Sequence, residues 1–327
     1  MTSKEIWVLA EVRGGRVTRG TLQLLGAARG LAAGDGAEAV AILTGGDDGV
    51  AGALAEHAPL VVRVEGPGLD TYEATRHAAA LAGLVKTRGL PLAVLAPASS
   101  TGLELVPRLA ALLGAGYLSS CVALSLEGGT LTARRPVHGG KAYEDVAFTA
   151  KPALVTARPG GFPMPERLAA RGRIETVPIA LPDRRGFEIV KRCATAAGRQ
   201  DVSEAKRVVS GGRGMGDATK FAMIEELASA LDAAVGASRA LVDAGFRPHS
   251  EQVGKSGKTI SPELYVACGI SGAIHHTLGM NTSKVVVAIN SDPEALIFKS
   301  ADFGIVGDGA QVVPALAATL RKVVKKA

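Results

Sequence analysis

The sequence predicts an α/β protein of two domains, each built on a mainly parallel, doubly wound sheet. Short apolar runs rich in Val, Ile, Leu and Ala stand between turn signals, as expected for strands buried on both faces. Stretches of helical periodicity alternate with these runs, and this alternation indicates βα units. The length of 327 residues is sufficient for two such domains.

The first domain is predicted over residues 1–205. Strands are expected at 6–10, 40–43, 60–64 and 92–96, and helices at 18–31, 50–56, 72–88 and 103–113. We expect Thr101 to cap the last helix. The residues after these strands are small and neutral, and they include no nucleophile–base pair or metal-ligand cluster. We therefore interpret this domain as a scaffold that docks a partner.

Residues 121–178 lack the strand–helix alternation of the preceding residues and contain glycine turns and frequent proline. Runs at 122–126, 130–133 and 153–156 are interpreted as short antiparallel strands beside a loop that reaches another surface. Within that loop, Arg158 is expected to begin an exposed cationic turn. The charged, partly helical segment 183–201 is interpreted as a connector to the second domain.

The second domain is predicted over residues 206–327. Its strands are expected at 208–210, 233–237, 265–268, 284–289 and 303–307, with helices at 221–231 and 272–278. In an open parallel sheet, ligands bind beyond the carboxyl ends of the strands. Those ends carry Arg213, Arg239, Ser271, Asn290 and Asp308. The convergence of these polar groups predicts a site for a large anionic cofactor.

Composition excludes several classes of function. The formal charge of +6 is divided evenly between the two domains without a basic stripe, so nucleic acid is not an expected partner. The 3 cysteines are far apart and give no zinc spacing or disulfide framework, which favours a reducing, cytoplasmic environment. No signal peptide is visible and no apolar run reaches the ~18 residues of a membrane span, so no membrane insertion is expected.

Three near matches to familiar motifs are rejected. Residues 254–259 (GKSGKT) resemble the end of a P-loop, but Gln252 occupies the position of the first required glycine. Residues 212–216 (GRGMG) resemble a dinucleotide-binding turn, but Asp217 replaces its last glycine. Residues 269–273 (GISGA) are one residue short of a serine nucleophile elbow. His275 and His276 are adjacent and lack the spacing of a helical zinc pair, so we assign no catalytic residue and no metal.

Six segments in the second domain share their order and spacing with one family. They are 208–214 (VVSGGRG), 234–239 (AVGASR), 252–258 (QVGKSGK), 262–265 (PELY), 269–276 (GISGAIHH) and 288–295 (AINSDPEA). Over residues 206–320 the chain resembles the alpha subunit of electron-transfer flavoproteins. The first domain resembles the family more loosely, at 6–11, 95–108 and 134–146.

The resemblance implies that FAD binds at the carboxyl ends of the second domain's strands. It also implies a heterodimer with a beta subunit that holds AMP or, in electron-bifurcating members that oxidise NADH, a second FAD. Such proteins are electron carriers that take electrons from acyl-CoA dehydrogenases or similar flavoenzymes and pass them to a quinone oxidoreductase. Two rival interpretations are a nicotinamide-dependent oxidoreductase and a nucleotide-binding interaction protein without redox chemistry. The colour of the preparation separates a flavoprotein, which is yellow, from a non-redox nucleotide-binding protein, which is colourless and takes up no added FAD.

The resemblance also implies which residues bind FAD. Arg239 lies over the flavin ring, where its charge stabilises the reduced cofactor. Ser256 lies beside flavin N5, and His276 donates to the C2 carbonyl. The full predicted set is Arg213, Ser238, Arg239, Val253, Gly254, Lys255, Ser256, Ser271, Gly272, Ala273, Ile274, His275, His276, Asn290, Asp308 and Gly309.

The chain departs from the family pattern near the predicted flavin. Lys255-Ser256 replaces the Gln-Thr of many relatives, and serine lacks the methyl group that fixes the threonine rotamer. His275 replaces a glutamine, and Gly309 stands where a larger apolar residue is common. We expect Lys258 to be a solvated charge. These departures affect the flavin potentials more than FAD binding.

Overall fold

The structure is a computed structural model that describes residues 3–181, 190–191, 200–216 and 220–324. The chain forms two compact units, unit 1 over Met1–Glu188 and unit 2 over Ile189–Ala327. This division falls before the predicted boundary at residue 205, because Val202 and Ala205 are buried in the core of unit 2. The predicted partly helical connector at 183–201 lies almost wholly outside the described residues.

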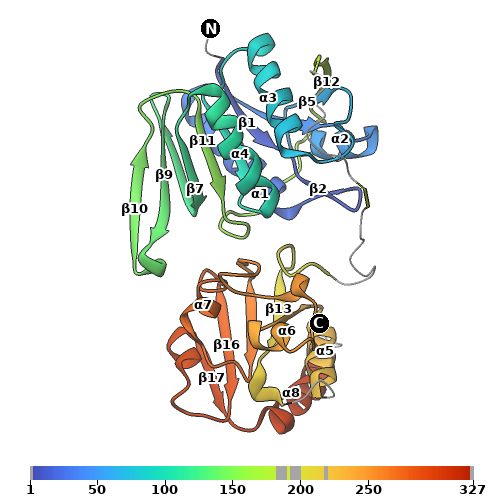
Figure 1. Ribbon diagram of the computed structural model, residues 1–327, viewed down its shortest axis with the longest axis vertical. Helices are drawn as coiled ribbons and strands as arrows, with labels where there is room; N and C mark the ends of the chain where they lie inside the picture. The colour runs from blue at the N-terminus through green and yellow to red at the C-terminus, as the bar shows by residue number, and fades with distance from the viewer. Residues whose placement is uncertain (1–2, 182–189, 192–199, 217–219, 325–327) are drawn as a thin grey trace. The chain divides into compact units, whose positions relative to one another are not determined.

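A seven-stranded parallel sheet forms the centre of unit 1 (Figure 1). In spatial order its strands are β12 (Arg173–Pro178), β5 (Leu60–Glu65), β4 (Glu38–Thr44), β1 (Glu5–Leu9), β6 (Ala93–Pro97), β11 (Ala153–Ala157) and β7 (Tyr117–Cys121). The middle strands are almost completely buried, so the sheet needs a layer on each face. The edge strands β7 and β12 are absent from the sequence prediction because they mix polar with apolar residues.

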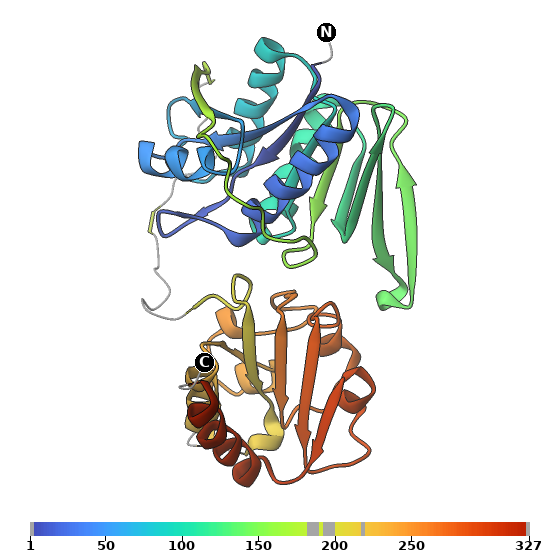
Figure 2. The same cartoon turned by 180° about the vertical axis from the view of Figure 1, so that it is seen from behind.

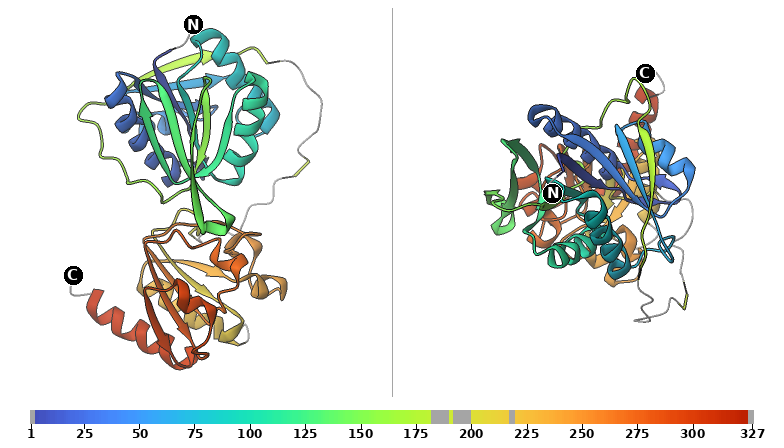
Figure 3. Two further views of the ribbon diagram at one scale, coloured as in Figure 1. Left: turned by 90° about the vertical axis from the view of Figure 1, so that its left-hand side faces the viewer. Right: turned by 90° about the horizontal axis from the view of Figure 1, so that it is seen from above.

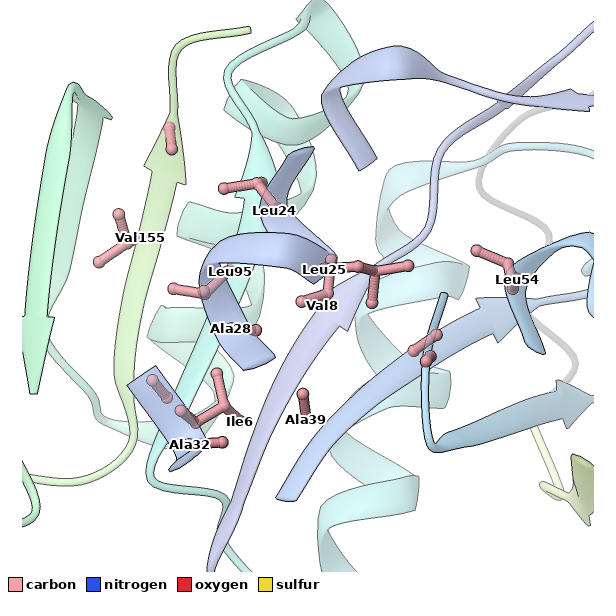
Figure 4. Close-up of a cluster of buried hydrophobic side chains, with 14 of the residues drawn as sticks. Ile6, Val8, Leu24, Leu25, Ala28, Ala32, Ala39, Leu54, Leu95 and Val155 are labelled. Carbon is pink, nitrogen blue, oxygen red and sulfur yellow. The ribbon is translucent and has the colours of Figure 1, made fainter. Parts of the chain in front are cut away.

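Two helical layers supply that cover. Helices α1 (Arg19–Asp35) and α2 (Asp48–Ala55) lie on one face, which Figure 2 shows from their side. Helices α3 (Ala74–Arg88) and α4 (Ser100–Leu113) cover the other. In the α1 layer, leucines of the helices interdigitate with Ile6 and Val8 of β1 (Figure 4). The alternation that predicted a parallel sheet is therefore confirmed in unit 1.

Polar side chains fix where these helices begin. Thr18, Asp47 and Glu73 precede α1, α2 and α3, and each accepts a hydrogen bond from a backbone N–H of the first turn. For α4 the cap is Ser99, whose Oγ accepts from the Gly102 N–H at 3.0 Å. The prediction that Thr101 caps this helix is wrong, because the helix begins at Ser100 and Thr101 lies within its first turn.

An antiparallel sheet stands at the flank of unit 1 (Figures 1 and 2). It consists of β8 (Ala123–Glu127), β9 (Thr130–Val137) and β10 (Ala142–Ala147), with the short helix η1 (His138–Gly140) between the last two. A two-stranded ribbon of β2 (Val12–Arg13) and β3 (Arg16–Val17) follows β1.

Two predictions for this region are corrected. The run at 153–156 is not antiparallel: it forms β11, which is parallel to both β6 and β7. All residues of β11 are buried, and a short buried run carries no signal of strand direction. Arg158, expected in an exposed turn, has its Nε and Nη1 atoms buried, and this burial lowers the pKa of the guanidinium.

Unit 2 contains a five-stranded parallel sheet, as predicted (Figure 1). Its strands in spatial order are β14 (Ala234–Ala237), β13 (Arg207–Gly211), β15 (Leu264–Cys268), β16 (Val285–Asn290) and β17 (Phe303–Val306). One face packs against α5 (Phe221–Ala230), α6 (Arg239–Asp243) and α8 (Gly309–Val324). The last turns of α8 extend away from the sheet (Figure 3, left).

The other face of this sheet is covered mainly by loops. They contain the short helices η4 (His249–Glu251), α7 (Ile274–Thr277) and η5 (Leu296–Ser300). Met215 of the short helix η2 (Arg213–Met215) is instead buried on the face covered by α5 and α8. Val253, Ile260, Met280 and Ile297 from these loops are buried against Tyr265 and its neighbours in the sheet. The loops therefore form part of the core, which fixes their position at the strand ends.

Gly102→Ala is expected to destabilise unit 1, whereas Gly30→Ala is not. A Cβ atom at Gly102 would lie 1.9 Å from the Pro97 carbonyl oxygen, but one at Gly30, in α1, would meet nothing within 4 Å. We expect Gly102→Ala to cost ~1–3 kcal/mol, as overpacking does, and Gly30→Ala to gain ~0.5–1 kcal/mol of helix propensity. Urea unfolding followed by the fluorescence of Trp7, the single tryptophan, measures both. Equal free energies of unfolding for the two variants would contradict this packing.

Candidate functional site

A cavity of about 590 Å³ lies at the carboxyl ends of the unit 2 strands. Of the sixteen residues predicted to bind a cofactor, eleven line it: Arg213, Ser238, Arg239, Val253, Gly254, Ser256, Ser271, Ala273, His275, His276 and Asn290. The structure thus brings together side chains from loops after four of the five strands. A cavity of this size lies within the range of ~300–1,000 Å³ that small-molecule and cofactor sites occupy.

Backbone contacts between glycines hold the loops that line the cavity. The Gly212 N–H donates to the Cys268 carbonyl at 2.8 Å, and the Gly214 N–H donates to the Gly269 carbonyl at 2.9 Å. A Cβ atom at Gly212 would lie 2.3 Å from the Gly269 oxygen. Gly269 itself has φ +61°, a region that favours glycine. The glycines after β13 therefore serve close backbone packing.

Ser238 and Arg239 begin α6 at the end of β14. The Ser238 N–H extends the sheet by donating to the Gly211 carbonyl at 3.0 Å. The Ser238 Oγ is buried and makes no hydrogen bond with any residue in the described part of the chain. Arg239 is exposed and its Nε lies 3.1 Å from Asp243 Oδ2. This part of the cavity thus offers a hydroxyl without a partner among the described residues and a cation held by a weak surface ion pair.

The segment 252–258 also lines the cavity, through Val253, Gly254 and Ser256. Its N-terminal end is joined to the sheet, since the Val253 N–H donates to the Ala237 carbonyl at 3.0 Å. The buried Gln252 donates to Ser256 Oγ at 3.0 Å. This bond orients the serine hydroxyl without the methyl group that threonine would provide. Lys255 is exposed and does not line the cavity, although its N–H donates to the His275 carbonyl at 2.7 Å.

His276 contributes a buried imidazole to the cavity wall. It is 7% exposed, and its Nε2 lies 2.8 Å from the hydroxyl of the fully buried Tyr265. Its Nδ1 makes no hydrogen bond with a described residue. Burial lowers the pKa of His276 to about 4, although the Val253 carbonyl acts in the opposite direction. The ring is therefore neutral at pH 7, with one donor and one acceptor nitrogen.

Asn290 closes the loop after β16. Its Nδ2 donates to the Ile270 carbonyl at 2.9 Å, and its Oδ1 accepts from the Asp292 N–H at 3.1 Å. The side chain therefore joins two loops that line the cavity.

The five remaining predicted residues do not line the cavity. Besides Lys255, they have local structural roles or face outward. Gly272 packs against Ile297, and Ile274 is 56% exposed. Asp308 accepts from the Ala310 N–H at 2.9 Å and so caps α8. A Cβ atom at Gly309 would lie 2.6 Å from Met215 Sδ, which accounts for the glycine where a larger residue was expected.

Some lining residues are absent from the predicted set. Asp292 and Glu294 place carboxylates at the cavity, and Ile270 and Leu296 provide apolar surface. The sequence signal that could have identified the acidic pair is its position just after Asn290, at the end of a strand. The buried partners Gln252 and Tyr265 give no such signal, because each is indistinguishable from a core or loop residue in the sequence.

Lys258 is not the solvated charge that the sequence suggested. Its Nζ lies 2.7 Å from Asp201 Oδ1, and both side chains are less than a third exposed. Burial raises the pKa of Asp201, but the bonds from Lys258 and Ser203 outweigh it and lower that pKa to about 2. The pair ties residue 201 to the segment that lines the cavity.

Among the described residues, no group of His, Cys, Asp and Glu is placed to hold a metal ion. No helix in the same part of the chain is long and apolar enough to cross a membrane.

Two family models match the chain. The electron transfer flavoprotein domain matches residues 6–182, and the electron transfer flavoprotein FAD-binding domain matches residues 201–281. The chain is 41% identical over 318 residues to the electron transfer flavoprotein subunit alpha of Bacillus subtilis strain 168, which covers 96% of each chain. It is 40% identical over 317 residues to the same subunit of Mycobacterium leprae, covering 95% of this chain and 96% of the relative. Protein FixB of Clostridium saccharobutylicum is 36% identical over 329 residues, covering 98% and 97% respectively.

Lys258→Met is expected to destabilise unit 2 in a pH-dependent manner. The pKa of Asp201 is depressed in the folded state, so its ion pair stabilises the fold above pH ~4 and this contribution is lost as the pH falls towards 2. We expect a loss of ~1 kcal/mol at pH 7 after allowance for solvent screening, shrinking below pH 4. Urea unfolding followed by circular dichroism measures it, with the exposed Lys255→Met as the matched control. A loss that is the same at pH 7 and pH 3, or equal in the two variants, would contradict the assignment.

Proposed function

Because the chain belongs to the electron-transfer flavoprotein alpha-subunit family, we propose that its unit 2 cavity binds FAD and that it works as the FAD-carrying subunit of a heterodimer with a beta subunit. Members of this family are electron carriers and not enzymes with a substrate of their own. In the proposed complex, donors of the acyl-CoA dehydrogenase type deliver electrons, as in fatty-acid β-oxidation. An acceptor of the quinone oxidoreductase type removes them.

The observation that carries the proposal is a pair of buried polar atoms that make no hydrogen bond with any described residue. Ser238 Oγ and His276 Nδ1 both belong to residues that line the cavity. A buried polar atom left unsatisfied costs ~1–3 kcal/mol, so a ligand that bonds to such atoms recovers that free energy. Arg213 and Arg239 add two cations at the same cavity. This combination fits a dinucleotide with a pyrophosphate and a ring system rich in acceptors.

The residues of the chain have distinct tasks in this proposal. FAD supplies the redox chemistry when it is bound. Arg213 and Arg239 supply positive charge to the anionic cofactor, and Ser238 and Ser256 supply hydroxyl groups. The glycine contacts and Asn290 keep the loops in place, so that little is lost on ordering them when FAD binds. Unit 1, with its separate antiparallel sheet, is proposed as the docking domain for the beta subunit, which holds AMP or a second FAD.

We propose the cytoplasm as the compartment. The buried thiols of Cys121 and Cys268 are free, as expected in a reducing environment.

The test of this function is the flavin content of the full chain produced together with its beta subunit. We expect a yellow complex with one FAD for each alpha chain, whose flavin is reduced by an acyl-CoA dehydrogenase and its substrate. NADH should not reduce it unless the complex is of the bifurcating type. A colourless complex that takes up no added FAD would contradict the proposal. FAD bound entirely by unit 1 would also contradict it.

Arg239→Ala is expected to lower the reduction potential of the bound FAD, and Asp243→Ala to raise it slightly. Arg239 provides positive charge at the cavity, and its ion-pair partner Asp243 offsets part of that charge. Removal of a cation close to a ring that gains negative charge shifts the potential by on the order of tens of millivolts. Spectroelectrochemical titration of the complex measures this. If the reduction potential is unchanged in both variants, Arg239 has no electrostatic effect on the flavin and only forms an ion pair on the surface of α6.

A further inference from the structure

A hydrogen-bonded pair lies directly behind the cavity wall. Tyr265, at 0% exposure, projects from the middle of the sheet, and its hydroxyl lies 2.8 Å from Nε2 of His276 on α7. The two rings are 6.1 Å apart at an interplanar angle of 45°, so they meet through their polar atoms and are not stacked. Because His276 lines the cavity and Tyr265 does not, the tyrosine acts on any ligand only through the histidine.

We propose that Tyr265 is a positioning residue that holds His276 in the Nδ1-protonated tautomer at the wall of the cavity. A neutral imidazole carries one proton, and the partner of one ring nitrogen decides where it lies. If the tyrosine hydroxyl donates to Nε2, that nitrogen must be the acceptor. The proton then lies on Nδ1, which becomes the only N–H donor that His276 offers.

The surroundings of the pair favour this direction of donation. The Tyr265 hydroxyl bonds to His276, whereas the buried Ser210 Oγ makes no hydrogen bond with a described residue. If Tyr265 donates to Nε2, its proton has an acceptor. In the reverse order the phenol proton would have no acceptor among the described residues, and Nδ1 would be a buried lone pair without a donor there.

The other ring nitrogen has no partner that would favour the opposite tautomer. Nδ1 of His276 makes no hydrogen bond with a described residue, so the bond from Tyr265 to Nε2 decides where the proton lies. Since burial keeps the ring neutral near pH 7, the tautomer is the remaining variable. The hydroxyl of Tyr265 settles it.

The tautomer has a consequence for the ligand, and this part rests on the proposed function. The Nδ1 atom has no hydrogen bond to a described residue, so an N–H there remains for an acceptor atom of FAD. Tyr265→Phe would release the constraint, and the ring would populate both tautomers. FAD binding should then weaken roughly two- to fivefold, because only the fraction of the ring that keeps its proton on Nδ1 can donate to the cofactor.

The experiment uses the full chain in complex with its beta subunit, with 15N label in the ring nitrogens of the 6 histidines. The His276 signals are assigned by their loss in His276→Gln. In the wild-type complex stripped of FAD, Nδ1 should have the shift of a protonated nitrogen and Nε2 that of an acceptor. In Tyr265→Phe both shifts should move towards those of a mixture. Tyr117→Phe is the matched control, because its hydroxyl bonds to Thr156 in unit 1 and its loss should leave His276 unchanged.

A wild-type His276 protonated at Nε2 would overturn the inference, and so would ring shifts that are the same in Tyr265→Phe. This readout needs neither bound FAD nor the variant to be stable, since the wild-type shifts alone decide the tautomer. FAD affinity is measured separately on the wild-type, Tyr265→Phe and Tyr117→Phe complexes. Shifts that move as expected while no complex binds FAD would support the tautomer and contradict the proposed function.

Discussion

The close approach of backbone at Gly212, Gly214 and Gly269 is the constraint on which the candidate site depends. The loops after β13 and β15 touch without side chains between them, and the sheet's hydrogen bonding continues past the strand ends. This brings Arg213 and Ser271 to the same cavity. Any larger residue at these three positions would separate the loops by several tenths of an ångström or more, and the polar groups would no longer converge.

Further bonds connect the remaining loops to this centre. Asn290 joins the loop after β16 to Ile270, and the Lys255 N–H joins the segment 252–258 to His275. The polar groups that line the cavity are therefore held in place by bonds within the protein. Two of them, Ser238 Oγ and His276 Nδ1, are buried and have no hydrogen-bond partner in the part of the chain that the structure describes. A fold that keeps such groups rigid loses stability for the sake of preorganised binding.

Much of the fold could be predicted from the sequence, because buried parallel strands produce apolar runs and their helices produce a regular period. The exceptions have physical causes. β11 looks the same in sequence whether it runs parallel or antiparallel, and only its neighbours β6 and β7 define its direction. Edge strands such as β12 mix exposed and half-buried residues, so the apolar signal is weak. The extent of unit 2 depends on where Val202 and Ala205 are buried, which is a tertiary property.

The sequence predicts the site only as far as it predicts where the strands end. Polar residues directly after strands were identified, and most of them line the cavity. Asp308 and Gly309 also follow a strand, yet one caps α8 and the other makes room for Met215. Position alone cannot separate a ligand contact from a cap. The sequence could not identify Gln252 and Tyr265, the buried residues behind the cavity wall, because their roles depend on the side chains that they contact.

The central claim is that FAD binds at the carboxyl ends of the unit 2 strands. Amide hydrogen exchange of the full complex, compared with and without FAD, tests it most directly. The account predicts slower exchange on FAD binding in segments 238–240, 253–256 and 269–276, which come from three different loops at one cavity. Exchange in the central strands of unit 1 should not change. Protection confined to unit 1, with no change in these three segments, would contradict the account.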